Sequence, residues 1–320
     1  MSDPRFGWAS TAEQVAAGHD LRGRTAVITG ASSGIGVETA RALAHAGADV
    51  LLGVRDLVAG DRAARSIAPT ARGLVQVRQL DLVDLDSVAS FAFSVGDPVD
   101  ILVANAGVSK TPDSHLPDGL EVRFATNHLG HFLLAHLLRG AMAERGARLV
   151  VVSSAAHKGN PVRLDDLQWR SREHSWGLAY GESKTANILF AQEATRRWGS
   201  DGIFANAVLP GSALTGLQRY HGDELKRAIG FIDADGVPDP TLKTAGQAAA
   251  TSVWAATAPE LAGRGGLVLE DCAEALPAGP DVHRWSGFDR SLADPETARA
   301  LWELSLELVR QHLEGWAPGA

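Results

Sequence analysis

Apolar segments of strand length alternate with helical segments from residue 25 onward, and this alternation restricts the possible folds more than any other feature. Between the apolar segments, hydrophobic residues recur at helical spacing. Strands separated by helices form a parallel sheet with crossover helices. The sequence therefore predicts an α/β fold with a Rossmann-type, doubly wound parallel sheet of about seven strands, at residues 25–29, 49–54, 74–80, 99–104, 148–153, 203–209 and 267–269.

A length of 320 residues is compatible with one elaborated domain or with two. We favour a single domain, residues 1–320, because the sheet accounts for most of the chain and no segment resembles a linker. The remaining length is assigned to an N-terminal extension, a substrate loop and a C-terminal extension, at 1–20, 212–245 and 271–320. Pro and Gly mark loops at 111–119, 155–179, 211–239 and 271–294. Ligands of such sheets bind beyond the carboxyl ends of the strands, so we expect the site in loops that follow strands.

Composition excludes several functional classes. A net charge of −8 leaves no strong uniform field for nucleic acid or an anionic membrane. Cys272 is the single cysteine, which excludes an intrachain disulfide and a zinc site built on several thiolates. No apolar run is long enough for a membrane span, and the N-terminal segment lacks the pattern of a signal peptide. We expect a cytoplasmic protein without a metal site.

A glycine-rich turn, Thr-Gly-Ala-Ser-Ser-Gly-Ile-Gly at residues 29–36, lies between a predicted strand and a predicted helix. Glycine allows the backbone to approach a pyrophosphate, and the helix N-terminus offers unpaired N–H groups. The spacing differs from the general G-x-G-x-x-G fingerprint, so an ordinary strand-to-helix turn is the alternative. We predict that the turn binds a dinucleotide through Thr29, Gly30, Ser32, Ser33, Gly34, Ile35 and Gly36.

The end of the second predicted strand bears on the choice between NADP(H) and NAD(H). An acidic residue there would accept hydrogen bonds from the adenosine ribose of NAD. Instead, neutral Val54 is followed by Arg55, which can pair with a 2′-phosphate. Asp56 would favour NAD if it occupied the ribose position. We predict NADP(H), with NAD(H) as the alternative.

Tyr180 and Lys184 are four residues apart on a predicted helix and therefore share one face. A nearby ammonium stabilises a phenolate and lowers the pKa of a tyrosine, which makes the pair suited to proton transfer. The chain has only two tyrosines and five lysines, so a chance pair at this spacing is rare. Ser153 and Ser154 follow a buried strand, where a hydroxyl can hold a carbonyl oxygen; the alternative is that they only end the strand.

Together these residues resemble the short-chain dehydrogenase/reductase superfamily over residues 21–270. The resemblance implies that Tyr180 is the general acid/base, that Lys184 lowers its pKa and binds the nicotinamide ribose, and that Ser154 positions the reacting oxygen. Asn127 resembles the helix asparagine that holds a water in the family's proton relay. Further cofactor contacts are implied for Asp81 and Leu82 at the adenine, Asn105, Ala106 and Gly107 beside the central sheet, and Pro210, Gly211 and Thr215 near the nicotinamide.

Residues 127–132, 153–157, 270–272 and 301–305 resemble the retinol-dehydrogenase-like branch, which includes the oxidoreductase domain of WW-domain proteins and bacterial relatives. Two features depart from the family. Ala104 stands where a second asparagine is usual, and the loop at 211–239 has no matching pattern. Because substrate identity depends on that loop, the resemblance does not define the substrate.

The sequence thus predicts an NADP(H)-dependent oxidoreductase that interconverts an alcohol and a carbonyl, with a small-molecule substrate and possible homo-oligomers. The alternatives are a reductase of an activated C=C bond and a non-catalytic NADP(H)-binding scaffold or sensor. His128 and His131 are expected in the core rather than on a metal, because no third ligand has fitting spacing. Core or lid packing is expected for the tryptophans at 169, 176 and 198, with an aromatic substrate platform as the alternative. A buried thiol is expected for the cysteine.

Overall fold

The computed structural model describes residues 5–96 and 98–314, so parts of both predicted extensions, 1–4 and 315–320, lie outside it. The described residues form one mixed sheet of eight strands in the order β3-β2-β1-β4-β5-β6-β7-β8. The strands are β1 (Thr25–Thr29), β2 (Asp49–Val54), β3 (Val75–Gln79), β4 (Ile101–Ala104), β5 (Ala147–Val152), β6 (Ile203–Leu209), β7 (Val268–Glu270) and β8 (Ala273–Glu274). The first seven strands pair in parallel, which confirms the doubly wound α/β fold.

The eighth strand corrects the prediction of seven strands. It pairs antiparallel with β7, with Glu270 opposite Ala273. The two intervening residues, Asp271 and Cys272, have φ of 50° and 56°. Positive φ at both positions is the geometry of a two-residue hairpin turn, which usually takes Asn or Gly. Residues 270–274 contain neither Asn nor Gly, so nothing in the sequence indicated a hairpin turn and a loop was predicted here.

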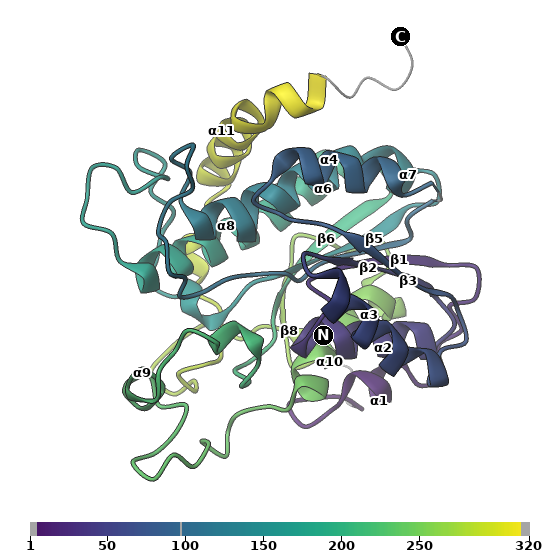
Figure 1. Ribbon diagram of the computed structural model, residues 1–320, viewed down its shortest axis with the longest axis horizontal. Helices are drawn as coiled ribbons and strands as arrows, with labels where there is room; N and C mark the ends of the chain where they lie inside the picture. The colour runs from purple at the N-terminus through teal and green to yellow at the C-terminus, as the bar shows by residue number, and fades with distance from the viewer. Residues whose placement is uncertain (1–4, 97, 315–320) are drawn as a thin grey trace.

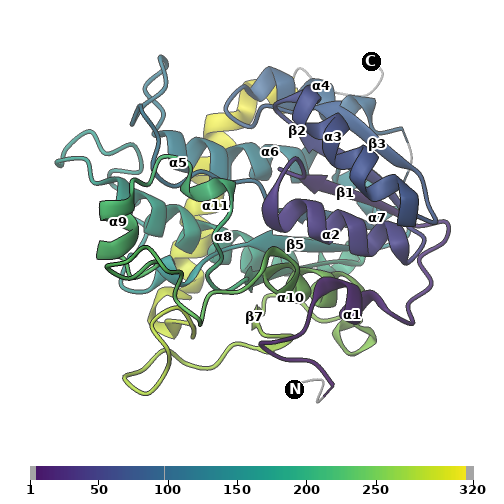
Figure 2. The same cartoon turned by 60° about the horizontal axis from the view of Figure 1, so that its bottom comes forward.

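Helices cover both faces of the sheet, which places the strands between two helical layers (Figures 1 and 2). The helices are α1 (Ala12–Ala16), α2 (Gly34–His45), α3 (Leu57–Ile67), α4 (Leu85–Ser94), α5 (Val122–Phe124), α6 (Gly130–Leu137), α7 (Arg139–Ala143), α8 (Trp176–Trp198), α9 (Asp223–Ala228), α10 (Ala245–Thr257) and α11 (Pro295–Glu314). One layer holds α1, α2, α3 and α10; the other holds α4, α6 and α8, with α11 packed outside it. Helix α9 lies within a segment predicted as a loop.

Polar residues at the N-caps fix where several helices begin. The carboxylate of Asp56 accepts a hydrogen bond from the N–H of Ala59 at the start of α3. Asp84 caps α4, and Thr244 forms a reciprocal capping box with Gln247 at the start of α10. Each cap satisfies an N–H group that has no partner within the helix, which typically stabilises a helix by about 1 kcal/mol.

Alternating residues of the strands pack against the two helical layers. Val27 of β1 and Val151 of β5 face α4, α6 and α8, whereas Ala26 and Val150 face α2 and α10. Trp302 of α11 extends the layer of α4, α6 and α8 outward, since its ring centroid lies 5.0 Å from that of Phe132. Burial on both faces explains why the strand sequences are continuously apolar rather than alternating.

The chain leaves the sheet centre in opposite directions from β1 and β4, which are neighbours in the sheet. A crevice forms where such a change of direction occurs, at the carboxyl ends of the strands. The loops after β1 and β4 touch there: a Cβ added at Gly30 would lie 2.8 Å from the Cα of Ala106. Only glycine therefore fits at position 30.

Candidate active site

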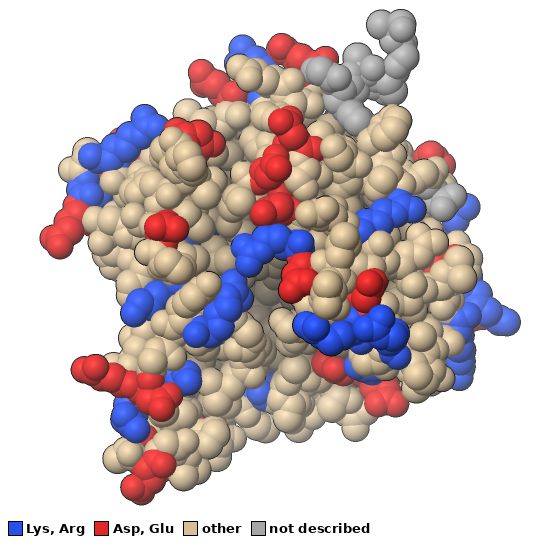
Figure 3. Space-filling model, viewed as in Figure 1, with Lys and Arg blue, Asp and Glu red and all other residues tan. Residues whose placement is uncertain are grey.

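A cavity of about 530 Å³ lies at the carboxyl ends of the strands. Figure 3 shows a hollow near the centre of this face with Lys and Arg side chains around it. The cavity lining includes Arg55, Arg219 and Arg284. All predicted site residues line the cavity except Thr29 and Asn127; those that line it are Gly30, Ser32, Ser33, Gly34, Ile35, Gly36, Arg55, Asp81, Leu82, Asn105, Ala106, Gly107, Ser154, Tyr180, Lys184, Pro210, Gly211 and Thr215.

The glycine turn lies against the cavity with its backbone closely surrounded. Gly30 and Gly34 have φ of 66° and 61°, the left-handed region that favours glycine. A Cβ at Gly36 would lie 2.6 Å from the side-chain nitrogen of Asn105. Ser33 is the N-cap of α2, but its side chain makes no capping hydrogen bond. The first N–H groups of α2 therefore lack a side-chain cap, an arrangement that suits a phosphate.

Thr29 lies beneath the cavity rather than in its wall. Its buried hydroxyl oxygen accepts hydrogen bonds from the N–H groups of Asn105 and Ala106, both at 3.0 Å. The side-chain amide of Asn105 donates to the carbonyl oxygen of Thr29 at 2.8 Å. These bonds tie the ends of β1 and β4 together, so Thr29 shapes the turn from below.

Arg55 and Asp56 both line the cavity at the end of β2, but they have different tasks in the fold. One oxygen of Asp56 accepts from the N–H of Ala59 at 3.0 Å and so caps α3. Val54, before them, is buried. Arg55 is thus the residue at this strand end that can present charge to a ligand without giving up a helix cap.

Helix α8 brings Tyr180 and Lys184 into the cavity wall, where the Lys184 Nζ lies 5.7 Å from the centre of the Tyr180 ring. The Lys184 Nζ donates to the carbonyl oxygen of Val152 at 3.0 Å. Burial lowers the pKa of Lys184 to about 8. Burial raises the pKa of Tyr180 above its usual value, against a hydrogen bond with the Ser154 side chain that lowers it. The pKa of Tyr180 is thus shifted in the direction opposite to the one that a nearby ammonium would cause, because desolvation of the phenolate dominates.

The two adjacent serines after β5 have separate roles. The hydroxyl of Ser153 donates to the carbonyl oxygen of Lys184 at 2.7 Å and anchors α8 to the sheet. Ser154 lines the cavity and makes the hydrogen bond with Tyr180. Its oxygen also accepts from the N–H of Ala156 at 3.2 Å, which fixes the side chain. Ser153 is thus structural, while Ser154 is available to a ligand.

Asn127 lies behind the loop after β4, on a π-helical turn at Ala125–Leu129. Its side chain accepts from the N–H of Val108 at 2.8 Å and donates to the Val108 carbonyl and the Ser183 hydroxyl at 3.0 and 2.9 Å. A Cβ at Gly107 would lie 3.3 Å from the Asn127 oxygen and 3.5 Å from the Lys184 Nζ. Asn127 is therefore a close neighbour of Lys184 although it does not line the cavity.

Sequence reasoning missed the aromatic part of the wall. The cavity is also lined by Trp176, His221, Phe231 and Trp285. The rings of Trp176 and His221 lie 5.4 Å apart, and those of Phe231 and Trp285 lie 5.2 Å apart. The position of Trp176 in the cavity wall is compatible with the lid packing expected for it and with the alternative of an aromatic platform. The other two tryptophans of that group are buried, as expected.

Trp285 belongs to a C-terminal segment that binds the loop after Ser154. The Lys158 Nζ donates to the carbonyl oxygens of Arg284 and Ser286 at 2.8 and 2.7 Å. The Nε2 of His157 accepts from the N–H of Asp289 at 3.0 Å. No periodicity in the sequence marks these contacts, because they join segments about 130 residues apart.

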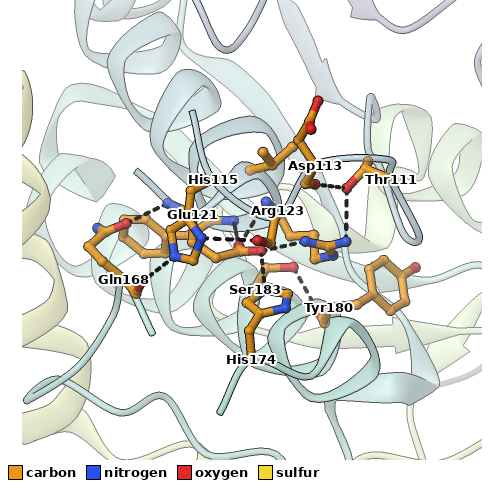
Figure 4. Close-up of polar contacts among 12 residues, drawn as sticks. Thr111, Asp113, His115, Glu121, Arg123, Gln168, His174, Tyr180 and Ser183 are labelled. Atoms are coloured by element: carbon orange, nitrogen blue, oxygen red, sulfur yellow. Dashed lines mark hydrogen bonds and ion pairs between the residues drawn. The ribbon is translucent and has the colours of Figure 1, made fainter. Parts of the chain in front are cut away.

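A buried ion pair supports the loop after β4 from outside the cavity (Figure 4). The Arg123 guanidinium donates to Glu121 at 2.6 Å and to the carbonyl oxygen of Ser109 at 2.7 Å. The N–H of Glu121 donates to the Gln168 side chain at 2.7 Å, and the His174 Nε2 lies 3.2 Å from the Glu121 carboxylate. The pair thus joins the insertion at 155–179 to the start of α5.

Two other kinds of site are absent from residues 5–96 and 98–314. These residues contain no group of three His, Cys, Asp or Glu residues placed to hold a metal ion. They also contain no helix with a sufficiently long apolar stretch to cross a membrane. His128 and His131 are buried in the core, as expected.

A doubly wound sheet with a glycine turn, a serine and a Tyr-Lys pair in one cavity at its switch point defines a Rossmann-type oxidoreductase. Residues 24–226 match the family model of the short chain dehydrogenases. The chain belongs to the short-chain dehydrogenase family, as the sequence motifs predicted.

Individual relatives agree with this assignment. A probable oxidoreductase of Streptomyces lividans is 46% identical, over 91% of this chain and 99% of that protein. Human retinol dehydrogenase 13 is 37% identical, over 90% and 85% of the two chains. The WW domain-containing oxidoreductase of Gallus gallus is also 37% identical, over 97% and 73%. A crystal structure from Mycobacterium paratuberculosis is similar with a TM-score of 0.72 at 36% identity, over 94% and 98%. These similarities confirm the resemblance to the retinol-dehydrogenase-like branch.

Proposed function

We propose that the protein is an NADP(H)-dependent oxidoreductase that interconverts an alcohol and a ketone or aldehyde, with Tyr180 as the general acid/base. One observation carries the proposal: the Tyr180 hydroxyl, hydrogen-bonded to Ser154 and one helical turn from Lys184, lines the same cavity as the glycine turn. A bound nicotinamide cofactor would supply the hydride.

The residues of the cavity fit such a cofactor. The α2 N-terminus, with no side-chain cap, and the closely packed glycines suit the pyrophosphate. Arg55 suits a 2′-phosphate because a guanidinium forms paired, charge-assisted hydrogen bonds with phosphate oxygens. Lys184 would bind the nicotinamide ribose, next to Tyr180.

In the direction of reduction, Tyr180 donates its hydroxyl proton to the carbonyl oxygen while the carbonyl carbon receives the hydride. A raised pKa keeps the phenol protonated at neutral pH, so the acid form is the one present. The Ser154 hydroxyl holds the same oxygen. The Lys184 ammonium stabilises the phenolate that remains, which then regains a proton from solvent.

The substrate half of the cavity favours a carbonyl compound with a bulky apolar body. Trp176, Phe231 and Trp285 present aromatic surface, and Ile229 and Leu217 add aliphatic surface. Such walls bind by burial of apolar area, with a few polar groups to fix orientation. We therefore propose aryl and cycloalkyl ketones as the probes for activity.

The test replaces each of the two tyrosines by phenylalanine and follows NADPH oxidation with a panel of such ketones. We expect Tyr180→Phe to lower kcat by about 100-fold or more, because the proton donor is lost while the ring remains. Tyr220→Phe is the matched control, since Tyr220 is exposed and does not line the cavity. NADPH binding, measured by fluorescence, should persist in both variants. A Tyr180→Phe enzyme with the wild-type kcat would refute the mechanism.

A further inference from the structure

A buried imidazole connects the glycine turn to the helix that carries Asn127. His131 of α6 is 1% exposed. Its Nδ1 lies 3.0 Å from the carbonyl oxygen of Asn127, and its Nε2 lies 2.8 Å from the hydroxyl oxygen of Thr29. Both of its partners adjoin the site, although the proposed reaction does not use this side chain directly.

The direction of each hydrogen bond follows from the chemistry of its two partners. A carbonyl oxygen only accepts, so the Nδ1 of His131 carries a hydrogen and donates it to Asn127. Burial lowers the pKa of His131 to about 4, so the ring is neutral at physiological pH. The Nε2 is then an acceptor, and the Thr29 hydroxyl donates to it.

The hydroxyl oxygen of Thr29 accepts in turn from the N–H groups of Asn105 and Ala106. A continuous series of hydrogen bonds thus runs from the peptide of Asn127 through His131 and Thr29 to the loop after β4. Every donor in this series has an acceptor. Removal of the imidazole would leave the buried Thr29 hydroxyl with only the longer contact to the carbonyl oxygen of Val103, at 3.4 Å, and would take the side-chain donor from the Asn127 carbonyl, which is costly.

The backbone around Asn127 explains why a side-chain donor is useful there. In the π-helical turn at Ala125–Leu129, the N–H of Gly130 donates to the carbonyl oxygen of Ala125, five residues earlier. Such turns distort the regular helix and occur frequently at functional sites. The Nδ1 of His131 supplies a donor to the Asn127 carbonyl within this distorted segment and so fixes the orientation of its peptide.

We propose that His131 is a positioning residue for the reaction: it holds Asn127 against Gly107 and Lys184 and couples this arrangement to the glycine turn through Thr29. The inference rests on the proposed function. It differs from a purely structural role, because loss of His131 should disturb turnover and cofactor binding beyond its effect on stability.

His128 provides a matched control on the neighbouring turn of the same chain segment. It is 1% exposed like His131, and burial lowers its pKa to about 3. Its Nε2, however, lies 2.9 Å from the hydroxyl oxygen of Ser305 on α11. The two histidines therefore match in burial and differ in whether their hydrogen bonds lead to the site.

The experiment compares His131→Phe with His128→Phe for thermal unfolding, NADPH affinity and ketone reduction. We expect both variants to lower Tm. Only His131→Phe should also lower kcat, by about 10- to 100-fold, because small displacements of the reacting groups strongly reduce the rate of the chemical step. It should raise the Kd of NADPH by about threefold to tenfold, the effect of losing one hydrogen bond in the supporting network. His128→Phe should leave both values within about twofold of wild type.

Two further variants keep the test decisive if His131→Phe fails to fold. His131→Asn retains a donor for the Asn127 carbonyl and should recover part of kcat. Thr29→Val removes the hydroxyl at the other end of the series with little change of shape, and should raise the NADPH Kd. Wild-type kcat and NADPH Kd in His131→Phe, or a wild-type NADPH Kd in Thr29→Val where His131→Phe does not fold, would overturn the inference. Failure of the proposed function would look different, since Tyr180→Phe would then reduce ketones normally.

Discussion

At the residue scale, Arg55 and Asp56 show how one strand end can hold opposite charges with different partners. The Asp56 carboxylate caps α3, whereas Arg55 lines the cavity. A carboxylate engaged by a helix N–H group is less available to the hydroxyls of a ribose. This division supports the preference for NADP(H) more strongly than the order of the residues alone.

Replacement of Arg55 by glutamine tests this preference. We expect Arg55→Gln to weaken NADPH binding by about 10- to 100-fold, because charge-assisted hydrogen bonds to the 2′-phosphate are lost. NADH affinity should change by less than about threefold. Isothermal titration of both cofactors measures the ratio, and Arg62→Gln, on the exposed side of α3, is the control. Equal affinities for the two cofactors in the wild type would contradict NADP(H) preference.

The sequence predicted the catalytic candidates at this scale but not their electrostatics. A spacing of four residues placed Tyr180 and Lys184 on one face of α8. The direction of the Tyr180 pKa shift depends on how much water the fold removes from the phenol, and spacing carries no such information. The separate tasks of Ser153 and Ser154 likewise depend on where each hydroxyl points.

At the scale of elements, the buried Glu121–Arg123 pair supports loops around the site. Both side chains are 1% exposed, and the Glu121 carboxylate also accepts from the N–H groups of Arg123 and Phe124 at the start of α5. A buried carboxylate with these partners holds α5, the loop after β4 and the insertion in one arrangement.

Removal of the arginine alone should leave this carboxylate buried without its charged partner. We expect Arg123→Met to lower the free energy of unfolding by about 3–5 kcal/mol, measured by urea denaturation. Arg139→Met breaks the more exposed pair with Asp201 and should cost at most about 1 kcal/mol. The double variant Glu121→Gln, Arg123→Met should regain part of the loss. Equal losses in the two arginine variants would contradict a buried, supporting pair.

The periodic elements were largely predictable, and the short irregular ones were not. Strands β1, β2 and β6 have the predicted bounds because their apolar runs end at turn residues. Helix α8 begins at Trp176, within the segment 155–179 that was predicted as a loop. Strand β8 and helix α9 are too short for periodicity to show.

At the scale of the whole molecule, the residues that line one half of the cavity could be predicted from the sequence, whereas those that line the other half could not. Most of the proposed cofactor half comes from loops that directly follow β1, β2, β3 and β4, where fold topology fixes the position of each loop. The aromatic half combines the start of α8 with Phe231 and Trp285, from segments far apart in the chain. Those segments meet only through tertiary contacts such as Lys158 with Ser286.

The measurement that tests the central claim most directly is the fate of a hydrogen label. NADPH carrying deuterium at the transferred C4 position is incubated with the protein and an aryl or cycloalkyl ketone, and the product is examined by NMR and mass spectrometry. We expect one deuterium on the carbon that bears the new hydroxyl group, formed by the wild type and slowed in Tyr180→Phe. With an enone as the substrate, label on the carbon beta to the carbonyl would instead indicate C=C reduction. Bound cofactor without any labelled product across the panel would contradict the account in favour of a non-catalytic NADP(H)-binding protein.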